Sequence, residues 1–235
     1  KQLHGKELSY NNIQDGNAAI EILKDFEGQP AVVGLKHMNP CGVGIGKTIE
    51  EAWDKAYEAD PVSIFGGIVA FNEPIHASVA EKLSKIFLEI IIAPAFDEDA
   101  FEILSKKKNI RLMQLDTSLE VNAKYKVTNV NDGLLVQDID DHKITAEDLR
   151  CVTTRKPTEE ELEQLLFAWK VVKHVKSNAI VLVKDNMTIG VGAGQMNRVG
   201  AAKIAIEQAG EKAKGSIMSS DAFFPMPDTV EEAVK

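Results

Sequence analysis

Cysteine is scarce in this chain of 235 residues, and the two that occur, Cys41 and Cys151, are far apart. Because there is no Cys-x-x-Cys pair, we expect no zinc site. We expect a reducing, cytoplasmic setting. Apolar runs are too short to span a bilayer, so no membrane contact is expected. Positive charge is also scarce, with a net charge of −9. This argues against a general nucleic-acid surface, although a few local cations can still bind a small anion.

The rest of the composition is that of an ordinary globular protein, with 44% hydrophobic and 27% charged residues. Its length allows one large domain or two small ones, with enough bulk for a core. The chain opens on Lys1-Gln2-Leu3-His4-Gly5, without an initiator Met or a signal peptide. This opening predicts a fragment or a processed chain.

Helical and strand-like patterns alternate along the first half, as is typical of α/β layers. Residues 11–16 are polar and turn-like, and a helix is expected only from Asn17. Thr48 and Glu51 form a capping box that opens a second helix, which ends at Asp60. Further helices are expected over 77–87 and 97–104, and strands over 31–35, 68–71, 90–92 and 110–115.

The pattern weakens from Asp116 to Pro157, where only short strands are expected. Thr158 and Glu161 then open a long helix, followed by strands over 179–183 and 188–191 and helices over 198–209 and from Asp228. We therefore predict three parts: a first unit (1–125), a connecting segment (126–160) and a second unit (161–235).

The two halves resemble each other. Residues 63–71 (SIFGGIVAF) are similar to residues 216–224 (SIMSSDAFF), and aligning Phe71 with Phe224 gives an offset of 224 − 71 = 153. The order of helices and strands repeats as well. A duplicated three-layer α/β/α protein is expected, with a site between its halves or between subunits.

Lys36 and His37 stand side by side where the strand over 31–35 should end. A glycine-rich run to Gly46 follows, and we expect it to form a loop that turns back on these side chains. Ligands of α/β proteins usually bind at such strand ends. A neighbouring cation favours the neutral, base-competent form of a histidine, and a lysine can stabilise developing negative charge. The alternative, a solvated lysine beside a structural histidine, stays open on the residues alone.

Two glycine-rich strings are not phosphate loops. Gly46-Lys47-Thr48 resembles the end of a P-loop, but Cys41 stands where that motif needs glycine. Gly190-Val191-Gly192-Ala193-Gly194 lacks the last glycine of a dinucleotide motif, because Gln195 takes that position. Both are expected to be turn glycines.

Three more positions are candidate ligand contacts. Asn178 precedes an apolar strand, and its amide can cap a helix or hydrogen-bond a ligand. Arg198 opens a helix after a glycine-rich loop, which suits an anion, although it can also be a surface arginine. Phe223 is either a core ring or a platform for a flat heterocycle.

Taken together, these strings are specific. The chain resembles the transformylase part of the AICAR transformylase/IMP cyclohydrolase family in its bacterial form, over essentially every residue. The strings that carry the resemblance are Leu8-Ser9-Tyr10-Asn11-Asn12, Lys36-His37-Met38-Asn39-Pro40-Cys41-Gly42, Ser63-Ile64-Phe65-Gly66-Gly67, Ser177-Asn178-Ala179-Ile180, Gly192-Ala193-Gly194-Gln195-Met196-Asn197-Arg198 and Ser219-Ser220-Asp221-Ala222-Phe223-Phe224-Pro225.

The resemblance implies two cytidine-deaminase-like units and a reaction of de novo purine biosynthesis. A formyl group would pass from 10-formyltetrahydrofolate, the co-substrate, to the 5-amino group of AICAR, giving FAICAR. His37 would be the general base and Lys36 the stabiliser of the developing charge. Asn178 would hold the carboxamide region of AICAR or assist proton transfer.

The resemblance also implies the binding residues. Gly66, Arg198 and Phe223 would contact AICAR, and so would Glu89, at a position where many members have aspartate. Val199 and Asp228 would lie near the folate. A potassium ion near the Ser-Asp-Ala-Phe-Phe segment and a homodimer with its active sites at the interface are implied as well.

The chain departs from the family in lacking the cyclohydrolase domain and segments at both ends that supply further ligand contacts. The resemblance therefore implies a fragment, and such a fragment can be inactive. Two alternatives stay open: a nucleotide-binding or dimerising module without activity, and a deaminase-like hydrolase. The absence of a His/Cys metal set argues against the second.

Overall fold

Nine strands form one mixed sheet in this computed structural model, which describes residues 1–116 and 124–235. Their order is β1-β6-β5-β4-β2-β3-β10-β9-β11. The pairs β4–β5 and β5–β6 are parallel, and the other neighbouring pairs are antiparallel. The strands of this sheet are β1 (Gln2–His4), β2 (Ala31–Lys36), β3 (Asn39–Ile45), β4 (Ile68–Phe71), β5 (Ile90–Ala93), β6 (Arg111–Gln114), β9 (Ile180–Lys184), β10 (Met187–Gly192) and β11 (Ile217–Ser220).

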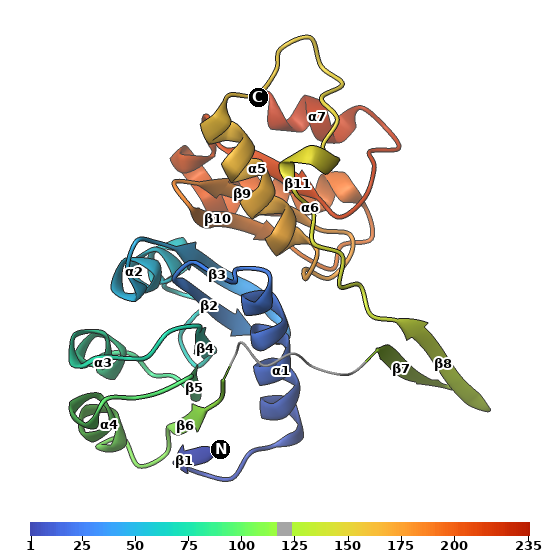
Figure 1. Cartoon of the computed structure of the whole chain (residues 1–235). Coiled ribbons are helices and arrows are strands. Elements are labelled where there is room, and N and C mark those ends of the chain that lie inside the picture. The colour runs from blue at the N-terminus through green and yellow to red at the C-terminus, as the bar shows by residue number, and fades with distance from the viewer. Residues whose placement is uncertain (117–123) are drawn as a thin grey trace.

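Helices cover both faces of the sheet (Figure 1). Helices α1 and α5 share one apolar core over one face. Helices α2, α3, α4 and α6 pack on the other face in two further cores. The bounds are α1 (Tyr10–Lys24), α2 (Ile49–Ala59), α3 (Ala77–Ser84), α4 (Glu98–Ser105), α5 (Glu159–Val172), α6 (Arg198–Ala209) and α7 (Asp228–Ala233). The predicted three-layer α/β/α fold is confirmed.

Helix α1 begins at Tyr10, so the prediction of a polar turn over 11–16 was wrong. The hydroxyl of Ser9 accepts the Asn12 N–H, and the Asn12 side chain accepts the Ser9 N–H, which together make a capping box. Gly16 is buried in this helix, and a Cβ there would lie 3.3 Å from Cδ1 of Ile92. The residues that resembled a turn are therefore a cap and a close helix–sheet contact.

The glycine-rich run after His37 is strand β3, so the prediction of a flexible loop was also wrong. Its glycines face helix α2 at close range: a Cβ on Gly42 would lie 2.1 Å from the Ala56 carbonyl oxygen, and one on Gly44 2.5 Å from that of Ala52. Gly190 and Gly192 of β10 face α6 in the same way. A Cβ on Gly190 would lie 2.0 Å from the Ala205 carbonyl oxygen, and one on Gly192 1.9 Å from that of Ala201. These glycines let a helix lie directly on the sheet.

The duplication is visible in the sheet. Helix α1 and the hairpin β2–β3 are followed by α2 and then β4, which pairs with β2. In the second half, α5, β9–β10, α6 and β11 repeat this order and pairing, and β3 pairs with β10 at the centre. The hairpin turns are 185 − 37 = 148 residues apart and the last strands 217 − 68 = 149. The predicted offset of 153 was therefore wrong by four or five residues.

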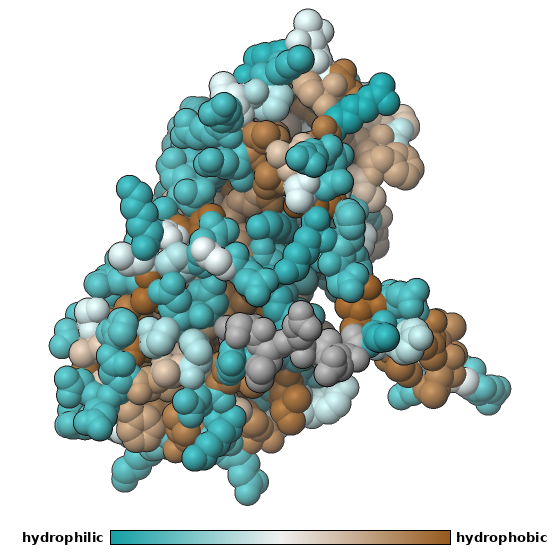
Figure 2. Space-filling model, viewed as in Figure 1, coloured by the Kyte–Doolittle hydropathy of each residue, from teal (hydrophilic) through white to brown (hydrophobic). Residues whose placement is uncertain are grey.

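A two-stranded hairpin, β7 (Tyr125–Val130) and β8 (Gly133–Asp138), projects from the body between the two repeats (Figure 1). Its side chains are exposed, and apolar atoms gather on it in Figure 2. It lies in the segment predicted to connect the units, although the three-part division remains a prediction. Among the described residues, no helix is long and apolar enough to cross a bilayer.

Candidate active site

The predicted catalytic pair lies on a tight hairpin turn. Lys36 is the last residue of β2, and Asn39 is the first of β3. The two turn residues, His37 and Met38, have φ values of 53° and 62°, the left-handed conformation of a two-residue hairpin turn. Non-glycine residues rarely adopt this conformation. The His37 side chain is exposed at this turn, whereas strand β2 before it is buried up to Leu35.

Three hydrogen bonds fix this turn to its surroundings. Nζ of Lys36 donates to the Phe65 carbonyl oxygen at 2.9 Å. The Met38 N–H donates to Oδ1 of Asp15 at 2.8 Å, on helix α1. Oδ1 of Asn39 accepts the Lys176 N–H at 3.1 Å, from the segment before β9. The turn is thereby attached to both repeats.

On the side of the first repeat, the Lys36 contact leads to Gly66 and Glu89. Gly66 follows Phe65 and donates its N–H to the Phe87 carbonyl oxygen at 2.7 Å, with φ of 72°. The Glu89 N–H donates to the carbonyl oxygen of Gly67, the next residue after Gly66. The Glu89 carboxylate accepts Nδ2 of Asn12 at 2.9 Å. The structure thus places both residues along one edge, beside the start of α1.

On the side of the second repeat, Asn178 follows Lys176 closely. Its Nδ2 donates to the Gln195 carbonyl oxygen at 2.8 Å, which connects it to the loop before α6. That loop ends at Asn197, whose side chain caps α6 by accepting the Gly200 N–H at 2.7 Å. Arg198 is therefore the first residue of α6, as predicted.

Arg198 and Asp221 form a largely buried ion pair, with their side chains 9% and 17% exposed. Nη1 of Arg198 donates to Oδ1 of Asp221 and, at 2.8 Å, to Oγ of Ser220. The Asp221 carboxylate also accepts the Ala179 N–H at 2.9 Å. Burial alone would raise the pKa of Asp221, but bonds from Ser177, Arg198 and Ala179 outweigh it and lower that pKa. Nε of Arg198 is buried and has no hydrogen-bond partner among the residues that the structure describes.

An open groove of about 630 Å³ runs beside the turn. Lys36 and His37 line one side, and residues of α6, including Glu207 and Gln208, line the other. Asp60, at the end of α2, accepts Nε2 of Gln208 at 2.7 Å and so joins the two sides. The volume falls in the range of small-molecule sites.

Comparison with known proteins identifies the family of this chain. A model of the AICARFT/IMPCHase bienzyme family matches residues 1–208. The chain belongs to this family. It is similar to proteins named bifunctional purine biosynthesis protein PurH from Oceanobacillus iheyensis (62% identity), Bacillus subtilis (63%) and Anoxybacillus flavithermus (66%), each over 235 residues. These alignments cover 100% of this chain and 46% of each relative, so it spans about half their length.

Membership of the AICARFT/IMPCHase family confirms the resemblance drawn from the sequence, but three site residues lie apart from the contacts above. Phe223 is 80% exposed, two residues beyond Asp221. Val199 is partly buried in the first turn of α6. Asp228 is exposed and uses Oδ1 to accept the Thr229 N–H at 2.7 Å. Their ligand roles remain predictions.

A potassium ion also remains a prediction. Ser220 and Asp221 carry oxygen atoms of the kind that hard cations take. However, the Arg198 guanidinium is bound to both side chains in this structure. The two residues thus make an ion pair as they stand, and no step below depends on a bound cation.

Sequence reasoning missed the residues that hold the site together. Asp15 was placed in a turn, and Asp60 only ended a helix. Glu207 and Gln208 belong to no motif. Their partners are distant in sequence: Met38 is 23 residues from Asp15, and Gln208 is 148 from Asp60. Only the duplication offered a signal, because the equivalent second turn binds α5 in the same way: the Asn186 N–H donates to Oε1 of Gln164 at 3.0 Å.

Proposed function

We propose that this chain carries the formyl-transfer half of its family's chemistry. A formyl group passes from 10-formyltetrahydrofolate to the 5-amino group of AICAR, giving FAICAR and tetrahydrofolate. The observation that carries the proposal is the Lys36–His37 turn, bonded to both repeats beside a groove, in a chain that belongs to this family.

The amine of AICAR is a weak nucleophile, so its proton must be removed as it attacks. The nitrogen lone pair forms a bond to the formyl carbon, and the C=O π electrons move to the oxygen. The His37 imidazole takes the amine proton. The oxygen's electrons then re-form the C=O bond, the bond from carbon to N10 of the folate breaks, and N10 accepts a proton.

Lys36 is suited to stabilise the oxyanion. An ammonium group has three donors, and the Phe65 carbonyl oxygen uses one of them. That bond holds the charge in a fixed place, as electrostatic stabilisation of a transition state requires. The tethers at Met38 and Asn39 fix the His37 backbone in the same way, because a general base must be positioned accurately.

The substrate contacts belong to the proposal as well. Gly66 follows Phe65, which accepts from Lys36, and Glu89 bonds to Gly67, the next residue. Asn178 lies two residues after Lys176, which donates to Asn39. Arg198 lies at a helix N-terminus, which favours an anionic group. We assign these residues and Phe223 to AICAR, and Val199 and Asp228 to the folate. A homodimer and a cytoplasmic location complete the proposal.

Substitution of His37 with a matched control tests the assignment. His37→Asn removes the base and keeps a residue type that tolerates positive φ. Asp185→Asn makes the same kind of change in the equivalent turn of the second repeat, where Asp185 has φ of 52°. We expect His37→Asn to lower formyl transfer by at least about 100-fold, the usual minimum for a general base, with little change in AICAR affinity. Asp185→Asn should leave both near wild type.

Calorimetric titration with AICAR and a spectrophotometric assay of tetrahydrofolate formation measure the two properties. Formyl transfer near wild type in His37→Asn would refute the general-base role. A wild-type chain that binds AICAR without turnover would be a binding module, the alternative left open by the sequence. A wild-type chain that neither binds AICAR nor transfers the formyl group would refute the proposal for this chain.

A further inference from the structure

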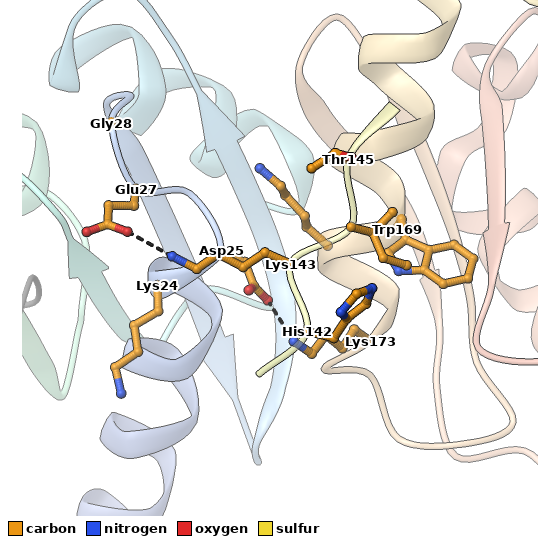
Figure 3. A pocket seen from close by; sticks show the side chains of 11 residues that line it. Lys24, Asp25, Glu27, Gly28, His142, Lys143, Thr145, Trp169 and Lys173 are labelled. Carbon is orange, nitrogen blue, oxygen red and sulfur yellow. Dashed lines mark hydrogen bonds and ion pairs between the residues drawn. The ribbon is translucent and has the colours of Figure 1, made fainter. Parts of the chain in front are cut away.

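A second cavity, of about 310 Å³, lies on the opposite side of the sheet from α2 and α6. It is lined by Lys24 at the end of α1, three residues that follow this helix (Asp25, Glu27 and Gly28), the segment 142–145, Trp169 and Lys170 of α5, and Lys173 just after α5 (Figure 3). It shares no residue with the groove beside His37. It joins the two repeats, because Asp25 of the first bonds to His174 of the second at 2.6 Å.

Positive charge concentrates in this cavity. Four lysines line it, Lys24, Lys143, Lys170 and Lys173, against only two carboxylates, Asp25 and Glu27. The protein as a whole carries a net charge of −9, so the cavity has the opposite sign to its surroundings. A cleft of one sign raises the local concentration of ions of the other sign.

Three of these lysines have carboxylate partners. Nζ of Lys143 lies 2.9 Å from Glu27, Nζ of Lys173 lies 3.7 Å from Asp25, and Nζ of Lys24 lies 2.7 Å from Glu21 on α1. Nζ of Lys170 instead lies 5.4 Å from the centre of the Phe26 ring. Burial lowers the pKa of Lys170, since its surroundings compensate its charge only in part. An anion in the cavity would supply the negative charge that compensates Lys170.

We propose that this cavity binds a small phosphorylated ligand, a phosphate monoester of sugar size. Lys24, Lys170 and Lys173 would contact the phosphate, because ammonium groups are strong donors to phosphate oxygens. Trp169 also lines the cavity and is 42% exposed, so its indole offers an apolar surface to the rest of the ligand. The volume is at the small end for ligand sites and suits one sugar phosphate rather than a dinucleotide.

The two tryptophans make the cavity directly observable. Trp53 is 1% exposed in the core under α2, whereas Trp169 lies at the cavity. We expect titration with ribose 5-phosphate, at constant ionic strength, to change tryptophan fluorescence saturably. Inorganic phosphate should do the same and compete, and ribose should not. Trp169→Phe should abolish the signal, while calorimetry should still detect binding.

Charge variants decide whether the lysines bind the ligand. Lys170→Gln should weaken ribose 5-phosphate binding by at least about tenfold, the effect of removing one charge-assisted contact. Lys106→Gln removes the same charge from the exposed residue that follows α4, away from the cavity, and should change the affinity by less than about twofold. Should Lys170→Gln fail to fold, Lys24→Gln at the cavity rim is expected to weaken binding in the same direction.

Any of three results would overturn the proposal. The first is that neither ribose 5-phosphate nor inorganic phosphate gives a saturable response. The second is that ribose binds as tightly as ribose 5-phosphate, and the third is that Lys106→Gln weakens binding as much as Lys170→Gln. The proposal stands apart from the formyl-transfer function, because Lys170→Gln should weaken ribose 5-phosphate binding and leave AICAR affinity and formyl transfer near wild type. Failure of one proposal is therefore distinguishable from failure of the other.

Discussion

The ion pair between Arg198 and Asp221 offers a sharp test of how the repeats differ. The first repeat has Ile49 at the first position of α2 and Asn72 directly after β4, each 149 residues before its counterpart (198 − 49 and 221 − 72). Oδ1 of Asn72 accepts the Ala31 N–H at 2.8 Å, as Oδ1 of Asp221 accepts the Ala179 N–H at 2.9 Å. The first repeat thus keeps this backbone hydrogen bond without an ion pair. The double variant Arg198→Ile/Asp221→Asn gives the second repeat the same two side chains.

Each single change should destabilise the protein more than the double change. Arg198→Ile leaves the Asp221 carboxylate largely buried without its cation, and removal of one partner from such a pair costs about 3 kcal/mol. Asp221→Asn leaves the guanidinium without its anion, at a similar cost of about 3 kcal/mol. The double variant leaves no buried charge and keeps an acceptor for the Ala179 N–H. We expect its cost to be about 1 kcal/mol, because neutral replacement of a buried pair is often nearly neutral.

Urea unfolding of the four proteins, followed by circular dichroism, gives the free energies of unfolding for a double-mutant cycle. We expect a coupling free energy of several kcal/mol, since two costs of about 3 kcal/mol would otherwise add. If the double variant lost as much stability as the two single variants combined, the pair would make no net contribution, and the comparison between repeats would be wrong.

Two further predictions concern packing and charge. Gly192→Ala should lower the free energy of unfolding by at least about 1–3 kcal/mol, because its Cβ would lie 1.9 Å from the Ala201 carbonyl oxygen. Gly133→Ala, whose Cβ would lie 4.0 Å from Cγ2 of Val130, is the control for urea unfolding and should change stability little; equal effects would contradict the packing argument. The Arg155 guanidinium and the Thr158 N–H lower the pKa of Glu161 from 4.5 to about 2, so their stabilising effect is complete above pH 4.5 and is lost as the pH falls towards 2. In an NMR titration, Arg155→Gln should return that pKa towards 4.5 and Lys156→Gln should not; an unchanged pKa in Arg155→Gln would rule out the ion pair as its cause.

Strong periodicity made part of the fold predictable from sequence. The strand over 68–71 and the helix over 198–209 have the predicted bounds, because each is a short, clear pattern between breakers. Strand β3 was missed because glycine and proline usually indicate a loop. Its glycines serve a tertiary contact, the approach of α2 to the sheet, and that approach has no local signature.

The candidate site also has a part that the sequence indicates and a part that it does not. Lys36 and His37 could be proposed from the sequence because two chemically capable residues stand together at a predicted strand end, and the structure places both at the β2–β3 turn. Asp15 and Lys176 could not be proposed, because they act on the turn across 23 and 137 residues. Hydrogen bonds of this length in sequence depend on the topology of the whole sheet. A single sequence indicates them only through a correctly aligned internal repeat.

The repeats also show what distinguishes a scaffold from a site. Both hairpin turns hold two residues at positive φ, and both give the N–H of the second residue to a helix, α1 or α5. In the second repeat, Oδ1 of the turn residue Asn186 also accepts Nε2 of Gln164, a bond that Met38, its counterpart in the first repeat, cannot make. In the first, the turn presents His37 to solvent beside Lys36. Both first turn residues, His37 and Asp185, are exposed, so the repeats differ in the side chain that the turn presents: an imidazole next to Lys36 in the first repeat and a carboxylate next to Lys184 in the second. This difference supports our proposal that the first repeat supplies the catalytic turn and the second supplies Asn178 and the Arg198–Asp221 ion pair.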